Sequence, residues 1–371
     1  MKPQAQIRFN NQVDKDSFSA TLRRRVDAYF KDNNISKHAD ATMVIKSIVL
    51  LSMYIIPFIC LLYFQPTFAV SLALWSIMGL GVAGIGMSIM HDANHGAYSS
   101  NKFVNTMMGH SLNLIGGAVL NWKLQHNVLH HTYTNVTYVD EDIADRAVLK
   151  FSPHTPVKSY HHMQYIYAFF FYGLLTIYWV IAKDIVQLFK FSASGVNKNT
   201  TTENAVFLAK LLFDKALYLT VLFVVPCYFF NFSFGEVLAG FCLMHFIAGV
   251  ILTVVFQLAH TIEGTAHPLP NEFGVIDNDW TVHQLETTAN FSPENPLITW
   301  YVGGLNFQVE HHLFPTICHV HYPNIAPIVE ATAKEFGVPY LVNYQFMDAL
   351  EAHIQLLHRV GRLPKLDEVM A

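Results

Sequence analysis

The sequence predicts an all-α integral membrane protein with four transmembrane helices in two hairpins, interfacial helices and a cytoplasmic helical cap that holds a histidine-rich dimetal site. Three observations support this prediction. Of the 371 residues, 52% are hydrophobic and only 13% are charged, about half the charged fraction of a typical soluble protein. Several apolar runs are long enough to cross a bilayer. Twenty histidines are present, and many of them follow the ends of those runs.

Two pairs of apolar runs predict the two transmembrane hairpins. Residues 47–63 and 67–90 form the first pair, and residues 216–232 and 237–259 form the second. Each run is close to the roughly 20 residues that a helix needs to span the hydrocarbon core. Because the connections are so short, each pair is expected to enter and leave the membrane on the same side.

A fifth apolar run, residues 164–182, is expected to lie in the membrane interface. It is rich in Tyr and Phe, a composition that suits an interfacial helix as well as a span. Histidines at 126–131 precede this run, and His260 follows the last apolar run. If these histidines serve one site, an even number of spans must separate them, and this excludes the fifth run from crossing.

The positive charges set the expected orientation. The two tight turns, at residues 64–66 and 233–236, contain no Lys or Arg. By the positive-inside rule, both termini and the histidine-rich site are therefore cytoplasmic. We expect a cytoplasmic N-terminal segment over residues 1–42, a membrane domain over residues 43–325 and a cytoplasmic helical segment over residues 326–371.

Composition and cysteine usage exclude several classes of protein. The formal net charge is −4 and no basic tract is present, which argues against a nucleic-acid partner. The four cysteines form no CxxC pair, so neither a disulfide framework nor a zinc ribbon is expected. The first residues are polar, which excludes a cleaved signal peptide.

Eight histidines next to apolar runs form the candidate metal site. "MHDANHGAYS" and "QHNVLHHTYTN" each place two histidines at i and i+4 on one face of an α-helix, and the second stretch adds a third, rotated by about 100°. "QLAHTIEG" contributes one more and "NFQVEHH" two. The eight are His91, His95, His126, His130, His131, His260, His311 and His312.

The number of histidines favours a site with two metals. A single histidine at the end of a span is usually an interfacial or hydrogen-bonded residue, but three clusters on one expected face favour ligands. Four donors suffice for tetrahedral zinc, so eight suit two ions of higher coordination number. Imidazole binds zinc, copper, iron and nickel alike, which leaves the metal open. A metal transporter would instead place histidines inside the spans, where only His245 lies.

"HDANH", "HNVLHH" and "QVEHH" resemble, in order and spacing, the three histidine boxes of the membrane fatty-acid desaturases. The resemblance covers roughly residues 45–325. Gln308 opens the third box where most members have histidine, and this resembles the front-end subfamily, the Δ6 and Δ5 desaturases that act on linoleoyl-type chains. The resemblance implies O₂-dependent desaturation of a long-chain fatty acyl substrate, with a membrane di-iron hydroxylase as the alternative.

The resemblance also implies the cofactors and partners. It makes the eight histidines ligands of two iron ions. Gln308 is then a further ligand through its carbonyl oxygen, a group that acts through water, or a support for His311. The acyl chain is carried by coenzyme A, a membrane lipid or an acyl-carrier protein, and an external reductant supplies electrons. Many eukaryotic front-end desaturases carry a fused cytochrome b5 domain with an "HPGG" haem motif, and the chain contains no such motif. We therefore expect a separate ferredoxin or cytochrome b5 as the electron donor. In this respect the chain resembles bacterial desaturases, so we expect it in a bacterial inner membrane.

Polar residues beside the boxes are candidate supports for the ligands. Metal-bound imidazoles usually donate their second ring N–H to a carboxylate, a carbonyl or water, which favours Asp92, Glu310 and Asn306 for that role. The acidic residues 140–142 are expected on a solvated loop face. Residues 283–284 either help to bind the acyl carrier or simply pack, and no catalytic residue is expected apart from the metal ligands.

Overall fold

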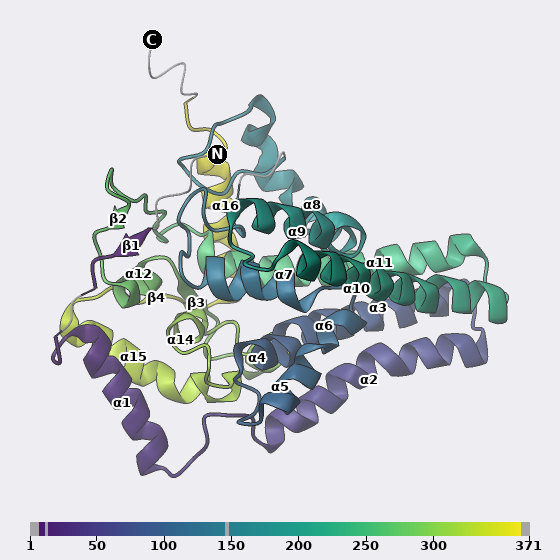
Figure 1. Ribbon diagram of the computed structural model, residues 1–371, viewed down its shortest axis with the longest axis horizontal. Helices are drawn as coiled ribbons and strands as arrows, with labels where there is room; N and C mark the ends of the chain where they lie inside the picture. Colours follow the sequence, from purple (N-terminus) through teal and green to yellow (C-terminus); the bar gives the residue numbers. More distant parts are fainter. Residues whose placement is uncertain (1–6, 12–13, 145–147, 365–371) are drawn as a thin grey trace. The chain divides into compact units, whose positions relative to one another are not determined.

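The computed structural model describes residues 7–11, 14–144 and 148–364, which fold mainly into helices, as predicted (Figure 1). They form two units. Unit 1 lies within residues 1–38, 125–168 and 255–371, and unit 2 within residues 39–124 and 169–254. Two helices, α8 (Gln164–Tyr178) and α11 (Phe234–His260), continue from one unit into the other. The domain boundaries at residues 42 and 325 stay predictions.

Unit 2 contains long apolar helices, of which α2 and α3 lie side by side (Figure 1). The Asp40 side chain caps the start of α2 by accepting a hydrogen bond from the backbone N–H of Met43. Three of the elements, η1, η4 and η5, are π-helical. The elements are α2 (Ala41–Phe64), α3 (Phe68–Gly84), η1 (Ile85–Ile89), α4 (Met90–His95), α5 (Lys102–Gly109), α6 (Ser111–Leu114), α7 (Val119–Lys123), η4 (Trp179–Lys183), α9 (Asp184–Ser194), α10 (Thr201–Leu219) and η5 (Thr220–Phe229).

Close packing of α3 in unit 2 depends on glycine. A Cβ at Gly81 would lie 2.9 Å from the backbone nitrogen of Tyr54 on α2, and a Cβ at Gly79 would lie 2.7 Å from the carbonyl oxygen of Met244 on α11. Small residues allow helices in a membrane to approach this closely and gain van der Waals contact. α3 is therefore fixed against two neighbours, and it leads directly into the first histidine cluster.

Four helical stretches of the described chain are long and apolar enough to cross a membrane, namely residues 41–64, 68–95, 159–194 and 234–260. The number agrees with the prediction, but the set differs. Residues 159–194 include the run that we expected in the interface, whereas the run at 216–232 is not among the four. That run begins at the end of α10, directly after Asp214 and Lys215, and continues through η5. Length and composition do not decide which stretches cross, so the topology stays a prediction.

Unit 1 contains shorter elements, including two parallel strand pairs, β1 with β2 and β3 with β4. The elements are β1 (Arg8–Phe9), α1 (Phe18–Asp32), η2 (Leu124–His130), η3 (Ser159–Met163), β2 (Val275–Ile276), α12 (Trp280–Glu286), β3 (Ala289–Phe291), α13 (Pro296–Tyr301), α14 (Gln308–Leu313), η6 (His319–His321), α15 (Tyr322–Phe336), β4 (Leu341–Asn343) and α16 (Phe346–Val360).

The core of unit 1 surrounds α14, which carries the third histidine box. α1 buries Leu22, Val26 and Phe30 in one cluster with Val309 of α14 and Ile325 of α15. α14 also contacts α12 and β3. Apolar packing thus fixes a helix of only six residues, which would be unstable by itself in water.

The C-terminal helix α16 is joined to the rest of unit 1 by a buried histidine. The His353 side chain is 0% exposed, and its Nδ1–H donates to the carbonyl oxygen of Thr261 at 2.6 Å. Burial lowers the pKa of His353 to about 4. The ring is therefore neutral in the folded protein at physiological pH.

Acidification is expected to destabilise unit 1 through His353. Its pKa rises from about 4 in the folded protein to about 6.5 in the unfolded chain, so the unfolded state binds a proton that the folded state does not. The stability that the neutral His353 ring contributes is fully present above about pH 6.5 and is lost as the pH falls toward 4. At pH 5 the free energy of unfolding is lower by about 2 kcal/mol. Thermal unfolding of the detergent-solubilised protein at several pH values should show a shallower pH dependence for His353→Gln.

The exposed His358, on the same helix, provides the matched control. His358→Gln should retain the pH dependence of the wild type. Equal pH dependences in the wild type and in His353→Gln would show that His353 does not titrate on unfolding.

Candidate metal centre

The predicted ligands lie at helix ends. In unit 2, His91 and His95 are on α4, where they occupy one face, with ring centroids 4.8 Å apart. Both rings also contact the indole of Trp122 on α7, each at a centroid distance of 5.6 Å. Gly96, with φ of 78°, ends α4 directly after His95. The i,i+4 arrangement predicted for this pair is therefore present.

The second cluster lies in unit 1 on a π-helix, η2, where we predicted an α-helix. The backbone N–H of His131 donates to the carbonyl oxygen of His126 at 3.0 Å, a bond between residues five apart. This wider turn brings His131 back over His126, and their Nε2 atoms are 3.2 Å apart. The His130 ring is stacked on that of His126 at 5.3 Å. Single π turns occur often at functional sites.

Two groups of three imidazoles converge within unit 1. In the first group, the rings of His130, His260 and His312 have centroids 4.7 to 4.9 Å apart. His260 is the last residue of α11, and His312 belongs to α14. In each group one ring nitrogen per residue lies within 4.8 Å of the others. The second group consists of His131, His311 and His312.

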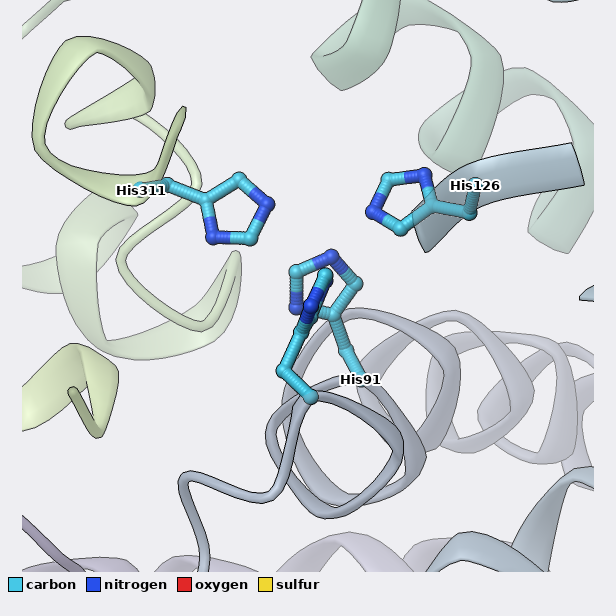
Figure 2. Close-up of side chains that lie close together, drawn as sticks. His91, His126 and His311 are labelled. Carbon is cyan, nitrogen blue, oxygen red and sulfur yellow. The ribbon is translucent and has the colours of Figure 1, made fainter. Parts of the chain in front are cut away.

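Figure 2 shows His311 of α14, a member of the second group, together with His126 of η2. Their rings are nearly parallel, with centroids 6.0 Å apart. The Nδ1 atom of His311 lies 3.2 Å from the hydroxyl oxygen of Tyr322. The same figure labels His91, which belongs to unit 2.

Hydrogen bonds at Nδ1 hold the rings of the first group. The Nδ1–H of His130 donates to Asp140 Oδ2 at 3.0 Å, and the Nδ1–H of His312 donates to Gln284 Oε1 at 2.8 Å. Both acceptors are fully buried. These tautomers follow from the hydrogen-bond network, because an acceptor at Nδ1 requires the proton there. Such partners fix the orientation of a ring and raise its basicity as a ligand.

The remaining nitrogens of this group fit a metal cation. His260 Nδ1–H donates to the carbonyl oxygen of Thr287 at 3.3 Å. Among the described residues, the Nε2 atoms of His130, His260 and His312 are buried and have no hydrogen-bond partner. Buried acceptors are rarely left unsatisfied. Three Nε2 lone pairs that converge in this way form a donor set for a metal.

Asp140 contradicts our expectation of a solvated acidic loop. Its side chain is 0% exposed, and besides His130 it accepts hydrogen bonds from the backbone N–H groups of Asn135 and Asp142, both at 2.9 Å. Burial alone would raise the pKa of Asp140, but His130 and these N–H donors outweigh burial and lower it. Burial likewise opposes protonation of His130, and Asp140 and Asp142 raise its pKa nevertheless. Asp140 is therefore ionised, and its hydrogen bond holds the imidazole of His130 in place.

Glu310, which we predicted to support a ligand, forms hydrogen bonds that support the backbone of α14. Its carboxylate accepts hydrogen bonds from Asn290 Nδ2 and the Tyr340 hydroxyl, both at 2.8 Å. Asn290 Oδ1 in turn accepts the backbone N–H of Val309 at 2.9 Å. Burial raises the pKa of Glu310 to about 7. These bonds join α14 to β3 and to the segment before β4.

The other two predicted supports differ in where they lie. Asn306 donates to the carbonyl oxygen of Ser292 at 3.2 Å and to the Thr299 hydroxyl at 2.9 Å, so it closes a loop. Asp92 Oδ1 lies 4.0 Å from Nδ1 of its neighbour His91. The Gln308 side chain, which is buried, approaches the imidazole of His260.

Sequence reasoning missed two acceptors, Asp140 and Gln284. Asp140 is ten residues from His130, and no helical spacing relates the two. Gln284 was left open between carrier binding and packing; its Oε1 also accepts the Thr134 hydroxyl at 2.9 Å. A single glutamine within a short helix carries no signal that would distinguish it.

The strand β1, near the N-terminus, packs against α12. β1 pairs with β2, and the Phe9 ring lies 4.9 Å from that of His283 and 6.1 Å from that of Tyr133. Trp280 Nε1–H donates to the carbonyl oxygen of His131 at 3.3 Å. Residues that are distant in sequence from the candidate ligands thus pack against the segments that carry or support them.

Helices of membrane-spanning length and a buried cluster of imidazoles indicate a membrane protein whose site is compatible with a bound metal. A profile of the fatty acid desaturase family matches residues 41–344. The chain is 36% identical to the sn-1 linoleoyl-lipid 6-desaturase of Arthrospira platensis, over 94% of both chains. It is 38% identical to the acyl-lipid (8-3)-desaturase of Physcomitrium patens, over 94% of this chain and 72% of that protein. It is 31% identical to the Delta(5) fatty acid desaturase A of Dictyostelium discoideum, over 95% and 76%.

The chain therefore belongs to the fatty acid desaturase family. It is an enzyme, an acyl desaturase, which introduces a double bond into a fatty acyl chain.

Replacement of Asp140 is expected to weaken metal binding without unfolding the protein. Asp140→Asn is close in volume but lacks the negative charge and can present an N–H to the Nδ1–H of His130. Loss of such a partner typically lowers metal affinity about 10–100-fold. Metal per chain, measured after dialysis against a graded series of chelator concentrations, should reveal this loss. Asp277→Asn, at an exposed position, should bind metal like the wild type. Equal metal retention by the two variants would show that Asp140 does not support metal binding.

Proposed function

We propose that this protein is a front-end desaturase that inserts a double bond between an existing one and the carboxyl end of a linoleoyl-type chain, at the Δ6 position. The reaction uses O₂, two iron ions and an external reductant. The observation that carries the proposal is the convergence of buried imidazoles whose Nε2 atoms are left for a metal, in a chain of this family.

The proposed ligand set follows the three histidine boxes. The Nε2 atoms of His130, His260 and His312 form one donor group, and His131 and His311, each with a ring nitrogen within 4.8 Å of one in His312, are proposed as donors to the second ion. The remaining ligands are proposed from the family motif alone: His91, His95, His126 and, through its carbonyl oxygen, Gln308. When bound, the two iron ions supply the oxidation of an unactivated C–H bond, which no amino-acid side chain can perform.

The protein's own groups orient the imidazoles and exclude water. Asp140 and Gln284 fix the rings of His130 and His312. Burial of the first group strengthens these electrostatic interactions, because the local dielectric constant is low. In the overall reaction two hydrogens leave neighbouring carbons of the acyl chain, and with two electrons and two protons they reduce O₂ to two molecules of water. The electrons are proposed to come from a separate ferredoxin or cytochrome b5.

The substrate class is proposed from the relatives. Two of them are named as linoleoyl-lipid 6-desaturases and another as an acyl-lipid desaturase. We therefore favour an acyl chain esterified to a membrane lipid over acyl-CoA or acyl-carrier protein. Gln308 in the third box agrees with front-end selectivity. The site and both termini are proposed to face the cytoplasm, at the inner membrane of a bacterium.

Expression in a host without desaturases tests the proposed regioselectivity. Cells fed linoleate should accumulate a trienoic acid with a new Δ6 bond, read by mass spectrometry of derivatised double bonds, and mainly in the lipid fraction. His312→Ala should form no product because it removes one of the three Nε2 donors of the first group. A hydroxylated product, or a new bond on the methyl side of the existing one, would refute the front-end assignment.

Substitution of Gln308 tests whether it is a ligand. If its carbonyl oxygen binds iron, Gln308→Ala should retain iron about 10–100-fold more weakly, whereas Gln308→His should retain it fully because imidazole is also a donor. Iron per chain is measured after chelator dialysis. Gln355→Ala, an exposed substitution on α16, controls for nonspecific loss, and iron retention by Gln308→Ala at the wild-type level would exclude ligation.

A further inference from the structure

A basic and aromatic surface lies where α8 begins, in unit 1. It combines the turn before α8 with the C-terminal end of α16. We call it the basic surface, and its members are Lys158, His162, Tyr165, His358 and Arg362, of which Lys158, His162, His358 and Arg362 are exposed.

Two contacts fix the halves of the basic surface against each other. Gln164 Nε2–H, at the start of α8, donates to the carbonyl oxygen of Leu357 at 2.9 Å. The backbone of Gly361 packs so closely on the carbonyl oxygen of His161 that a Cβ at residue 361 would collide with it. The end of α16 therefore packs on η3, and this brings the basic residues of the two segments to the same part of unit 1.

Tyr165 organises the cations of this surface. Its ring lies 5.1 Å from that of His358, and the guanidinium carbon of Arg362 lies 5.3 Å from the ring centroid. The Nζ atom of Lys158 lies 5.9 Å from the ring of Tyr160. Contacts between a cation and an aromatic face hold a long side chain in place while its charge remains available to a ligand.

The two strongest bases of the basic surface are not ion-paired with any carboxylate of the described residues. Within the described part of the chain, no carboxylate forms an ion pair with Lys158 or Arg362. The neighbouring Arg359 is different, since its Nε–H donates to Glu263 at 2.6 Å. Lys158 and Arg362 thus provide two positive charges that have no ion-pair partner among the described residues, and the imidazoles of His162 and His358 add further hydrogen-bonding groups.

The position of the basic surface relates it to lipid. Met163, the last residue of η3, and Ile166 and Phe170 of α8 follow one another at helical spacing and are 40%, 57% and 57% exposed. An exposed apolar stripe of this kind on a membrane protein is covered by lipid. In either arrangement of α8, crossing the membrane or lying in the interface, we infer that its first turn lies at the boundary between lipid and water. Tyrosines and basic residues at this boundary meet the phosphate groups of the lipid.

We propose that the basic surface binds the headgroup phosphate of an anionic phospholipid of the surrounding bilayer. Arg362 provides planar guanidinium donors that match a phosphate, and Lys158 adds a second charge. A zwitterionic lipid also has a phosphate, but its ammonium group is repelled by the same cations, so the surface selects anionic lipids. This binding requires neither the metal nor the acyl substrate of the proposed reaction.

Binding of a short-chain lipid to the full-length protein tests the proposal. The protein in neutral detergent is titrated with dioctanoyl phosphatidylglycerol or dioctanoyl phosphatidylcholine, and bound lipid is counted by native mass spectrometry. We expect clear preference for phosphatidylglycerol and a loss of about 30-fold in its affinity in the double variant Lys158→Gln, Arg362→Gln, as for two basic residues at a membrane surface. Arg24→Gln with Lys31→Gln, exposed residues of α1, should leave the affinity unchanged.

Three results would overturn the proposal. They are equal affinity for the two lipids, unchanged phosphatidylglycerol affinity in the double variant, and displacement of phosphatidylglycerol by inorganic phosphate at equal concentration, which would indicate a site for free anions. If the double variant does not fold, Arg362→Gln compared with the charge-retaining Arg362→Lys decides instead, with Gln alone losing affinity. Because binding is measured without turnover, failure here leaves the proposed desaturase reaction untouched.

Discussion

The hydrogen bonds at Nδ1 of His130, His260 and His312 are the constraint on which the candidate site depends. A histidine beside a metal is useful only if the proton is on the other nitrogen, and Asp140, Gln284 and a backbone carbonyl hold it there. Much of unit 1 serves to place these three acceptors. The elements around α14 are short, yet they come from widely separated parts of the chain, so tertiary packing supplies the order that local structure cannot.

The histidines themselves were visible in the sequence because their signal is local. Spacing of i and i+4 next to an apolar run is a property of a few consecutive residues, and His91 and His95 lie together as that spacing predicts. The acceptors were not visible because they depend on contacts between distant segments. Glu310 illustrates the difference, since it is adjacent to His311 in sequence, yet neighbours on a helix point about 100° apart and its carboxylate bonds to Asn290 and Tyr340.

The helical fold and the number of apolar helices of spanning length were also predictable, because hydropathy averages over many residues. The choice between residues 159–194 and 216–232 was not, since mean hydropathy does not distinguish a helix in the interface from one that crosses. Such a choice depends on partners. Lys215, for example, forms an ion pair with Asp184 at 2.8 Å within unit 2. The sequence near Lys215 does not predict this ion pair.

The π turn from His126 to His131 has a consequence for how the chain tolerates changes in length. The bond from His131 N–H to the carbonyl oxygen of His126 encloses one residue more than an α-helical turn. Removal of a single residue between them would let the turn relax to an ordinary α-helix and carry one imidazole around the axis, even though every histidine was still present. The number of residues in this segment fixes the positions of the imidazoles. An insertion or deletion there is therefore more damaging than most substitutions of the intervening side chains.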